Sequence, residues 1–351
     1  MGCNVDGFET NPFMAFLSRV KARDYSSVKN LETLALQCLS GRARSGEFAL
    51  PNDTTLVERR GLKKWLLNKR VATRFEQLRT SVARVWPPSA RDLLLLAVMA
   101  STEKVANARK DGKCWRYKSR WQDLKYDEQN LDDEFARQVL RFSEDIERCP
   151  RLLGRVRISR ADSRRLASRI GADRTYDGLF TSPPYLNSFD YTDIYRPELL
   201  MLKQASNAAE LRRMRFATLR SHVQVAWKSS PSLAIRLLQE KINAVSEADL
   251  WCGRIPDMIN AYFVDLDRVI EQCSRYLKKG ARAGFVVADS AYNGIVIPVD
   301  VVLGAILERR GFTPTDTVVF RETLGNGNHQ QKSDKQLREV LLLAQFKGLP
   351  S

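Results

Sequence analysis

The sequence is poor in the residues on which metal and disulfide chemistry depend. Its 351 residues include two histidines and six cysteines, and no two cysteines have the CxxC spacing of a zinc site or a redox pair. We therefore expect no bound metal, no disulfide framework and no histidine-based catalytic triad. This cysteine usage is typical of a reduced, cytoplasmic protein.

Long apolar runs are also missing. The apolar run 93–100 is too short to cross a bilayer, and the first residues lack the basic and apolar regions of a signal peptide. The sequence therefore predicts no membrane partner.

Acidic residues are outnumbered by basic ones. The chain has 57 Lys and Arg against 41 Asp and Glu, a formal net charge of +16, and its 44% hydrophobic and 28% charged residues are typical of a globular protein. A surplus of positive charge favours a polyanionic partner, with nucleic acid as the first candidate. A basic surface without a partner, or one attracted to anionic lipid, is the alternative.

Strand and helix patterns alternate outside one long helical segment. Short apolar or alternating runs predict strands, amphipathic runs predict helices behind them, and this order indicates an α/β fold with a doubly wound sheet. Strands are expected at 3–8, 156–159, 178–180, 283–288, 317–321 and 340–346, and helices at 13–21, 163–170, 257–277 and 299–310.

The helical pattern is continuous enough over residues 25–150 to predict an inserted helical domain, with breaks at 51–53, 86–88 and 110–113. A smaller basic helical insertion is expected at 193–255. The remaining segments, 1–24 and 151–351, then form one discontinuous α/β domain. The helical insertion is a candidate for DNA binding.

The most informative motif is Thr181-Ser182-Pro183-Pro184-Tyr185, directly after a predicted buried strand. Two prolines hold the backbone extended at the strand end, where open α/β sheets bind ligands. The Ser182 hydroxyl and the Pro183 carbonyl can accept hydrogen bonds from an aromatic amino group and draw its nitrogen towards tetrahedral geometry. Tyr185 offers a stacking face for a base that has left the double helix. The alternative is that the prolines only form a turn.

This pentapeptide resembles the motif of the exocyclic-amino DNA methyltransferases. The Ser182 version is similar to the cytosine-N4 branch, whereas Asp or Asn at that position is commoner in adenine-N6 enzymes. Residues 186–191 and 198–200 also resemble one bacterial subgroup of the family. The resemblance implies S-adenosylmethionine as methyl donor, DNA as substrate, and a Rossmann-like sheet that is mostly parallel with an antiparallel last strand.

The same resemblance implies a set of cofactor contacts. Glu9, at the end of the first strand, is the acid that binds the ribose diol, and Asn11-Pro12-Phe13 lines the adenosine. Asp162, at the end of the next strand, is placed near the adenine amino group, and Thr181 belongs to the cofactor side of the motif. Without the resemblance, Glu9 is a solvated strand-end acid and Asp162 is a helix N-cap.

One expected feature of the family is missing from this sequence. Its members hold the methionine part of the cofactor on a glycine-rich loop after the first strand, and the one Gly-x-Gly here, Gly325-Asn326-Gly327, lies between the last two predicted strands. We therefore expect that this sequence is truncated upstream, or that it is one half of a split enzyme. In the second case another polypeptide supplies the loop.

Basic residues interleaved with aromatic ones predict the DNA contacts. The strongest cluster lies around residues 107–120, and Asn187 and a polar loop near residue 330 add to it. The predicted DNA-binding residues are Arg109, Lys110, Lys113, Arg116, Lys118, Asn187 and Lys332. Each basic pair taken alone is more often a solvated surface. An RNA or protein amine methyltransferase, and a non-catalytic DNA-binding subunit, remain as alternatives.

Overall fold

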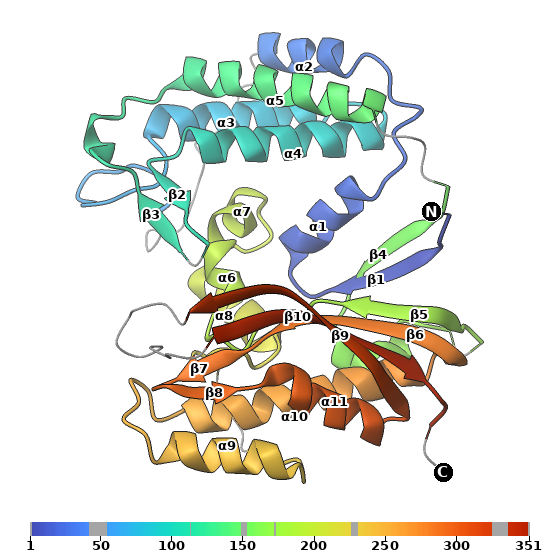
Figure 1. Ribbon diagram of the computed structural model, residues 1–351. Helices are drawn as coiled ribbons and strands as arrows, with labels where there is room; N and C mark the ends of the chain where they lie inside the picture. Colours follow the sequence, from blue (N-terminus) through green and yellow to red (C-terminus); the bar gives the residue numbers. More distant parts are fainter. Residues whose placement is uncertain are drawn as a thin grey trace. The chain divides into compact units, whose positions relative to one another are not determined.

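A computed structural model of the chain describes residues 2–41, 55–112, 114–148, 153–171, 173–225, 231–324 and 336–349 (Figure 1). Contacts divide the chain into two compact units. Unit 1 comprises Met1–Arg160 and Thr192–Met214, and unit 2 comprises Ala161–Tyr191 and Arg215–Ser351.

Unit 1 contains a parallel pair of strands, β1 (Val5–Glu9) and β4 (Val156–Arg160). Helix α1 (Pro12–Lys21) follows β1, and the Asn11 side chain caps it by accepting hydrogen bonds from two backbone N–H groups. The predicted strand, cap and helix are thereby confirmed. Because α1 contacts both β4 and the helical segment, residues 1–24 are grouped with that segment rather than with unit 2.

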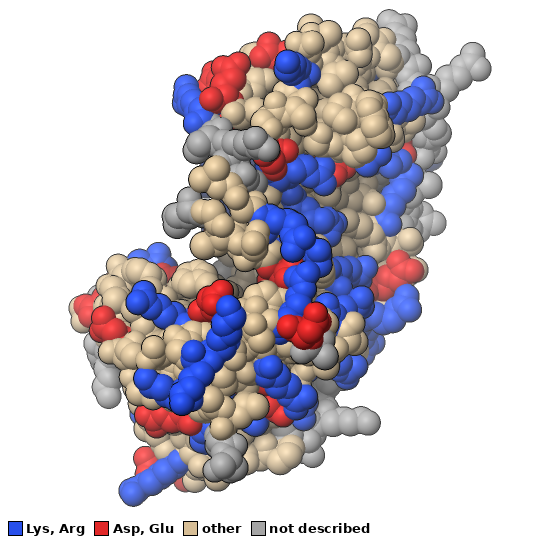
Figure 2. Space-filling view, turned by 90° about the vertical axis from the view of Figure 1, so that its right-hand side faces the viewer, with Lys and Arg blue, Asp and Glu red and all other residues tan. Residues whose placement is uncertain are grey.

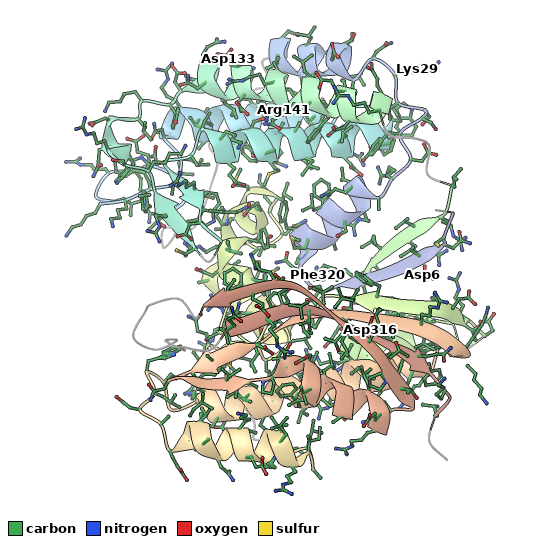
Figure 3. All side chains as sticks on the ribbon, in the orientation of Figure 1. Asp6, Lys29, Asp133, Arg141, Asp316 and Phe320 are labelled. Atoms are coloured by element: carbon green, nitrogen blue, oxygen red, sulfur yellow. The ribbon has the colours of Figure 1, made fainter. Side chains whose placement is uncertain are left out.

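Four helices form the main part of unit 1 and lie within the segment 25–150 that the sequence predicts to be helical. They lie side by side in Figure 1 and bury Phe75, Leu94 and Phe135 between them. The outward face of the last helix carries Asp133 and Arg141 (Figure 3). The helices are α2 (Leu31–Ser40), α3 (Lys69–Val82), α4 (Pro88–Lys104) and α5 (Glu128–Arg148).

An antiparallel hairpin interrupts the helices where only a break was predicted. Strands β2 (Ala108–Lys110) and β3 (Trp115–Tyr117) pair so that Arg109 lies opposite Arg116. Gly112 adopts a φ of 94° between them, a conformation that favours glycine. Short helical elements follow: η1 (Trp121–Asp123), α6 (Tyr191–Ile194), α7 (Arg196–Met201) and α8 (Ala208–Ala217).

A four-stranded sheet is the centre of unit 2. Its order is β5-β6-β10-β9; β5 is parallel to β6, whereas β10, the last strand of the chain, is antiparallel to both of its neighbours. Edge strand β9 exposes Asp316 and Phe320 (Figure 3). The strands are β5 (Tyr176–Thr181), β6 (Leu277–Ala288), β9 (Phe312–Leu324) and β10 (Gln336–Phe346).

These strands confirm the α/β class and the antiparallel last strand, but parallel pairing is less extensive than predicted. Among the described strands, β1–β4 and β5–β6 are parallel pairs, and they belong to separate sheets. The doubly wound, Rossmann-like arrangement therefore stays a prediction.

Helices cover one face of the four-stranded sheet. Helix α11 (Val299–Arg309) contacts β6, β9 and β10, and α10 (Ile255–Ser274) packs beside it (Figure 1). Their core includes the fully buried Tyr262 and Phe285. The remaining elements are η2 (Ser163–Ser168), α9 (Arg236–Ser246), β7 (Ser290–Tyr292) and β8 (Ile295–Ile297).

Two predicted helices differ from the structure, one in its type and the other in its end. The segment after Asp162 forms a 3₁₀ helix rather than an α-helix, because Arg165 has non-helical dihedral angles (φ −143°, ψ 54°). Helix α10 ends at Ser274, so Lys278 to Gly280 already lie in β6 instead of closing the helix. No helix in the described ranges is long and apolar enough to cross a membrane.

Candidate functional site

The proline motif lies where the sequence predicts it. Strand β5 ends at Thr181, so Ser182 to Tyr185 leave its carboxyl end, next to the parallel strand β6. Ser182 is exposed, Pro183 is buried, and Pro184 and Tyr185 are half-buried. The motif therefore presents a hydroxyl and an aromatic ring at the strand end that the sequence indicates as the ligand-binding edge.

Tyr185 is held by a residue to which no sequence motif points. Its hydroxyl donates a 2.5 Å hydrogen bond to Glu339 Oε1 on β10, and Glu339 Oε2 lies 2.9 Å from Arg321 Nη2 on β9. Burial and the bond to Glu339 raise the pKa of Tyr185 to about 12, although a hydrogen bond with Ser182 acts in the opposite direction. The ring of Tyr185 is thus anchored at its hydroxyl end.

The segment after the motif is fixed by its own contacts. The Leu186 carbonyl accepts a 2.8 Å bond from the buried Tyr292 hydroxyl, and the Ser188 N–H donates to the Ser221 carbonyl at 3.0 Å. Asp190 forms an ion pair with Arg215. Tertiary contacts therefore hold the motif in place from its C-terminal side.

Four buried polar atoms in unit 2 have no hydrogen-bond partner among the described residues. They are Asn187 Oδ1, His222 Nδ1, the Tyr262 hydroxyl and Ser290 Oγ. Burial raises the pKa of Tyr262, and the hydroxyls of Tyr191 and Tyr185 are close enough to raise it further. Since an unpaired buried polar atom is costly, these atoms are candidates for ligand contacts. Of the four residues, Asn187 is also predicted from the sequence, as a DNA contact.

Asp162 is a helix cap, as one of its two predicted roles requires. Its Oδ1 accepts a 3.0 Å bond from the Arg164 N–H, and both carboxylate oxygens contact the Arg164 guanidinium. Arg164 also bonds to the buried Asp265 at 2.9 Å. The carboxylate is therefore oriented by its own neighbours, and its contact with adenine stays a prediction.

Glu9 is the strand-end acid of unit 1. Its Oε1 accepts a 2.7 Å bond from the Asn11 N–H, and the Asn11 side chain in turn accepts from the Phe13 N–H at 3.0 Å. Phe13 is buried, and its ring centroid lies 5.5 Å from that of Tyr195. The structure thus brings together Glu9 and residues 11–13 in unit 1, whereas Asp162 and the proline motif belong to unit 2.

The predicted DNA-binding cations of the hairpin fall into two kinds. Arg109 and Arg116 are exposed, although Arg116 contacts Asp111 at 2.7 Å. Lys110 is largely enclosed: its ammonium forms ion pairs with Glu103, at 3.2 Å, and with Glu198. Burial alone would lower the pKa of Lys110, but these carboxylates outweigh it and raise the pKa.

The other predicted contacts are less exposed or lie outside the described residues. The Lys118 ammonium donates to the Lys104 carbonyl at 2.9 Å, so it too is engaged within the unit. Lys113 and Lys332 lie outside the described residues.

Figure 2 shows a face on which basic side chains are more frequent than acidic ones, in line with the net charge of +16. In the described part of the chain, no group of three or more His, Cys, Asp or Glu side chains could hold a metal ion.

Comparison with known proteins identifies relatives for about half of the chain. The chain is 31% identical over 177 residues to Type II methyltransferase M.AvaI of Nostoc sp. (strain PCC 7120 / SAG 25.82 / UTEX 2576), and the match covers 47% of this chain and 36% of that protein. The match to M.AvaI of Anabaena variabilis has the same values. Type II methyltransferase M.BsoBI of Geobacillus stearothermophilus is 28% identical over 180 residues, 45% of this chain and 35% of that protein. No family model matches.

Proposed function

We propose that this chain, a relative of the type II methyltransferases with an exocyclic-amino motif, transfers a methyl group from S-adenosylmethionine to a base amine in DNA. The observation that carries the proposal is the position of Ser182 and Tyr185 at the carboxyl end of β5, with Tyr185 anchored by Glu339. Cytosine N4 is the first candidate target, because serine precedes the two prolines.

The side chains of the motif suit an amine that must become a nucleophile. Hydrogen bonds from the amino group to Ser182 Oγ and the Pro183 carbonyl would turn the nitrogen lone pair out of the ring plane. So oriented, the nitrogen could accept the methyl group that a bound S-adenosylmethionine would supply, and the proton that it loses would pass to solvent water. Tyr185 would hold the base by stacking, since an enzyme that modifies a base must take it out of the duplex.

The residues present fit part of the cofactor. A carboxylate at the end of a strand, held by a backbone N–H as Glu9 is by Asn11, can accept the hydrogen bonds of a ribose diol. Asn11, Pro12 and Phe13 are further proposed adenosine contacts on unit 1, and Asp162 and Thr181 are proposed contacts on unit 2. S-adenosylmethionine, when bound, supplies the electrophilic methyl group.

We further propose that the glycine-rich loop comes from a segment or polypeptide beyond this sequence. Among the described strands, β1 and β4 pair only with each other, and β5 pairs only with β6, so β1, β4 and β5 each have one edge without a strand partner. An added strand could form backbone hydrogen bonds there. Calorimetric titration of this chain with S-adenosylmethionine tests the point: tight binding by the chain alone would contradict it.

The activity is tested by measuring methyl transfer with the chain together with the proposed segment or polypeptide that carries the glycine-rich loop, called the partner segment below. We expect labelled methyl groups to enter DNA, and Ser182→Ala and Tyr185→Ala to abolish the transfer. Ser246→Ala, on the exposed face of α9, is the matched control and should be neutral. Chromatography of the digested DNA separates N4-methylcytosine from N6-methyladenine.

Other outcomes favour the alternatives. Methylation of RNA or protein in preference to DNA would identify a different amine substrate. DNA binding without any methyl transfer, with and without the partner segment, would identify a non-catalytic DNA-binding subunit.

A further inference from the structure

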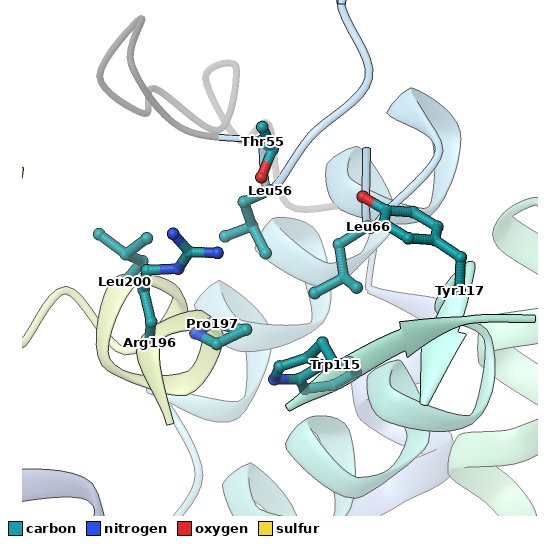
Figure 4. Close-up of a pocket in the computed structure, with 8 residues that line it drawn as sticks. All are labelled: Thr55, Leu56, Leu66, Trp115, Tyr117, Arg196, Pro197 and Leu200. Carbon is teal, nitrogen blue, oxygen red and sulfur yellow. The ribbon is translucent and has the colours of Figure 1, made fainter. Parts of the chain in front are cut away.

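A pocket of about 140 Å³ lies within unit 1, and none of its lining residues is among those proposed for methyl transfer (Figure 4). Strand β3 contributes two aromatic rings to it, and α7 contributes a cation and an aliphatic side chain. Figure 4 shows two leucines that close it from the opposite side. Its principal lining residues are Leu56, Leu66, Trp115, Tyr117, Arg196 and Leu200.

The aromatic wall is preformed. Trp115 Nε1 donates a 2.8 Å bond to the Ile194 carbonyl, and the Lys110 ammonium lies 5.2 Å from the centroid of the Trp115 ring. The Tyr117 ring packs against Trp121 with 5.0 Å between centroids. Since these rings are already positioned by other contacts, a ligand would not have to order them, and less binding energy would be lost.

The chemistry of the walls selects a flat ring with a polar edge and a nearby negative charge. Aliphatic and aromatic side chains form most of the surface, whereas the Arg196 guanidinium provides the cation. The ion pair of Arg196 with Asp193 is long, 4.0 Å, and both side chains are about half exposed, so it offers little resistance to a competing phosphate. Lys64, 5.5 Å from the centroid of the Tyr117 ring, adds positive charge.

We propose that this pocket binds one unstacked pyrimidine base of a nucleic-acid strand, with Arg196 on the adjacent phosphate. The volume favours a single ring, because it is well below the roughly 300–1,000 Å³ of sites for drug-sized ligands. Stacking on aromatic side chains beside a cation is the usual way in which proteins hold unpaired bases. The proposal rests on the proposed action on DNA and assigns to unit 1 a base contact separate from the one at Tyr185.

The first experiment locates the base directly. Oligonucleotides that carry 5-iodouracil at successive positions are bound to the full chain, irradiated, and the crosslinked peptide is identified by mass spectrometry. We expect one position to crosslink to Trp115 or Tyr117. If the chain binds the oligonucleotides but crosslinks to them only through other segments, base binding in this pocket is contradicted. The proposed function is unaffected by that result.

The second experiment measures the contact energetically. Removing the crosslinking base, so that an abasic site remains, should weaken binding on the order of 10-fold, and Tyr117→Leu or Arg196→Gln should remove that difference. Arg213→Gln, an exposed cation on α8, is the matched control and should preserve it. Thermal melting verifies that each variant is folded. An abasic effect that survives in both pocket variants contradicts the proposal, whereas failure of the wild-type chain to bind any nucleic acid contradicts the proposed function itself.

Discussion

The Tyr185 hydroxyl donates a 2.5 Å hydrogen bond to Glu339 Oε1, joining the proline motif to a strand 154 positions later in the chain. Glu339 is in turn paired with Arg321 on β9. An aromatic ring that is fixed at one end presents its face in a constant orientation. We infer that Glu339 positions Tyr185 for stacking without itself contacting the base.

Glu339→Ala should therefore reduce methyl transfer, although Glu339 itself does not contact the base. Hydrogen bonds to charged groups contribute about 1.5–3 kcal/mol, so we expect a loss of roughly 10- to 100-fold in the single-turnover rate. Glu339→Gln keeps an acceptor and should lose less. In a Tyr185→Phe background Glu339→Ala should add little, and independent, additive losses would show that Glu339 does not act through Tyr185.

The raised pKa of Tyr185 predicts a loss of stability at alkaline pH. The pKa is about 12 in the folded chain and about 10 for an ordinary tyrosine, so above pH 10 the unfolded form loses its proton first. The stability associated with Tyr185 is present below pH 10 and decreases as the pH rises towards 12. Urea denaturation should show a smaller decrease over this window in Tyr185→Phe than in wild type. Equal decreases in stability in the two proteins would show that the pKa of the Tyr185 hydroxyl is that of an ordinary exposed tyrosine.

The buried ion pair of Lys110 predicts a structural role for this residue. Lys110→Met leaves the Glu198 carboxylate buried without its cation, and we expect the free energy of unfolding to fall by about 3–5 kcal/mol. The double variant Lys110→Met/Glu198→Leu should recover most of the loss. Arg109→Met, an exposed neighbour on the same hairpin, is the control and should change stability little. Denaturation by urea measures all three.

The exposed arginines of the hairpin predict a change in the salt dependence of DNA binding. If Arg109 and Arg116 contact phosphates, replacing either by alanine should reduce the slope of log affinity against log salt concentration by about 1. Arg236→Ala on α9, where the side chain is 93% exposed, should leave the slope unchanged. Titrations by fluorescence anisotropy at several salt concentrations provide the slopes. A weakened affinity with an unaltered slope would argue against phosphate contacts.

Much of the fold is predictable because its signals are local. The Asn11 cap, the alternating or apolar strands and the turn between α3 and α4 each depend on a few neighbouring residues, and all are present in the structure. The hairpin of β2 and β3 was missed because two three-residue strands carry too little alternation to be recognised. The position of the proline motif at the end of β5 was predicted for the same local reason.

The anchor of Tyr185 could not be predicted, because it depends on strand register. Glu339 lies opposite Ala288 on β6 and opposite Arg321 on β9. A shift of one residue in β10 would turn its carboxylate to the other face of the sheet. Likewise, nothing near Lys110 in the sequence distinguishes it from the exposed Arg109, since its partner Glu198 is 88 positions away.

By itself, the sequence determined the class of the fold, the strand ends that carry Glu9 and Ser182, and the family that these residues resemble. Tertiary structure decided which charged groups are engaged within the chain and which are exposed. It also decided that Tyr185 is anchored by Glu339, and that Trp115, Tyr117 and Arg196 enclose a pocket. The physical reason is that chain geometry over a few residues sets local structure, whereas ion pairs, anchors and pockets need side chains that only packing brings together.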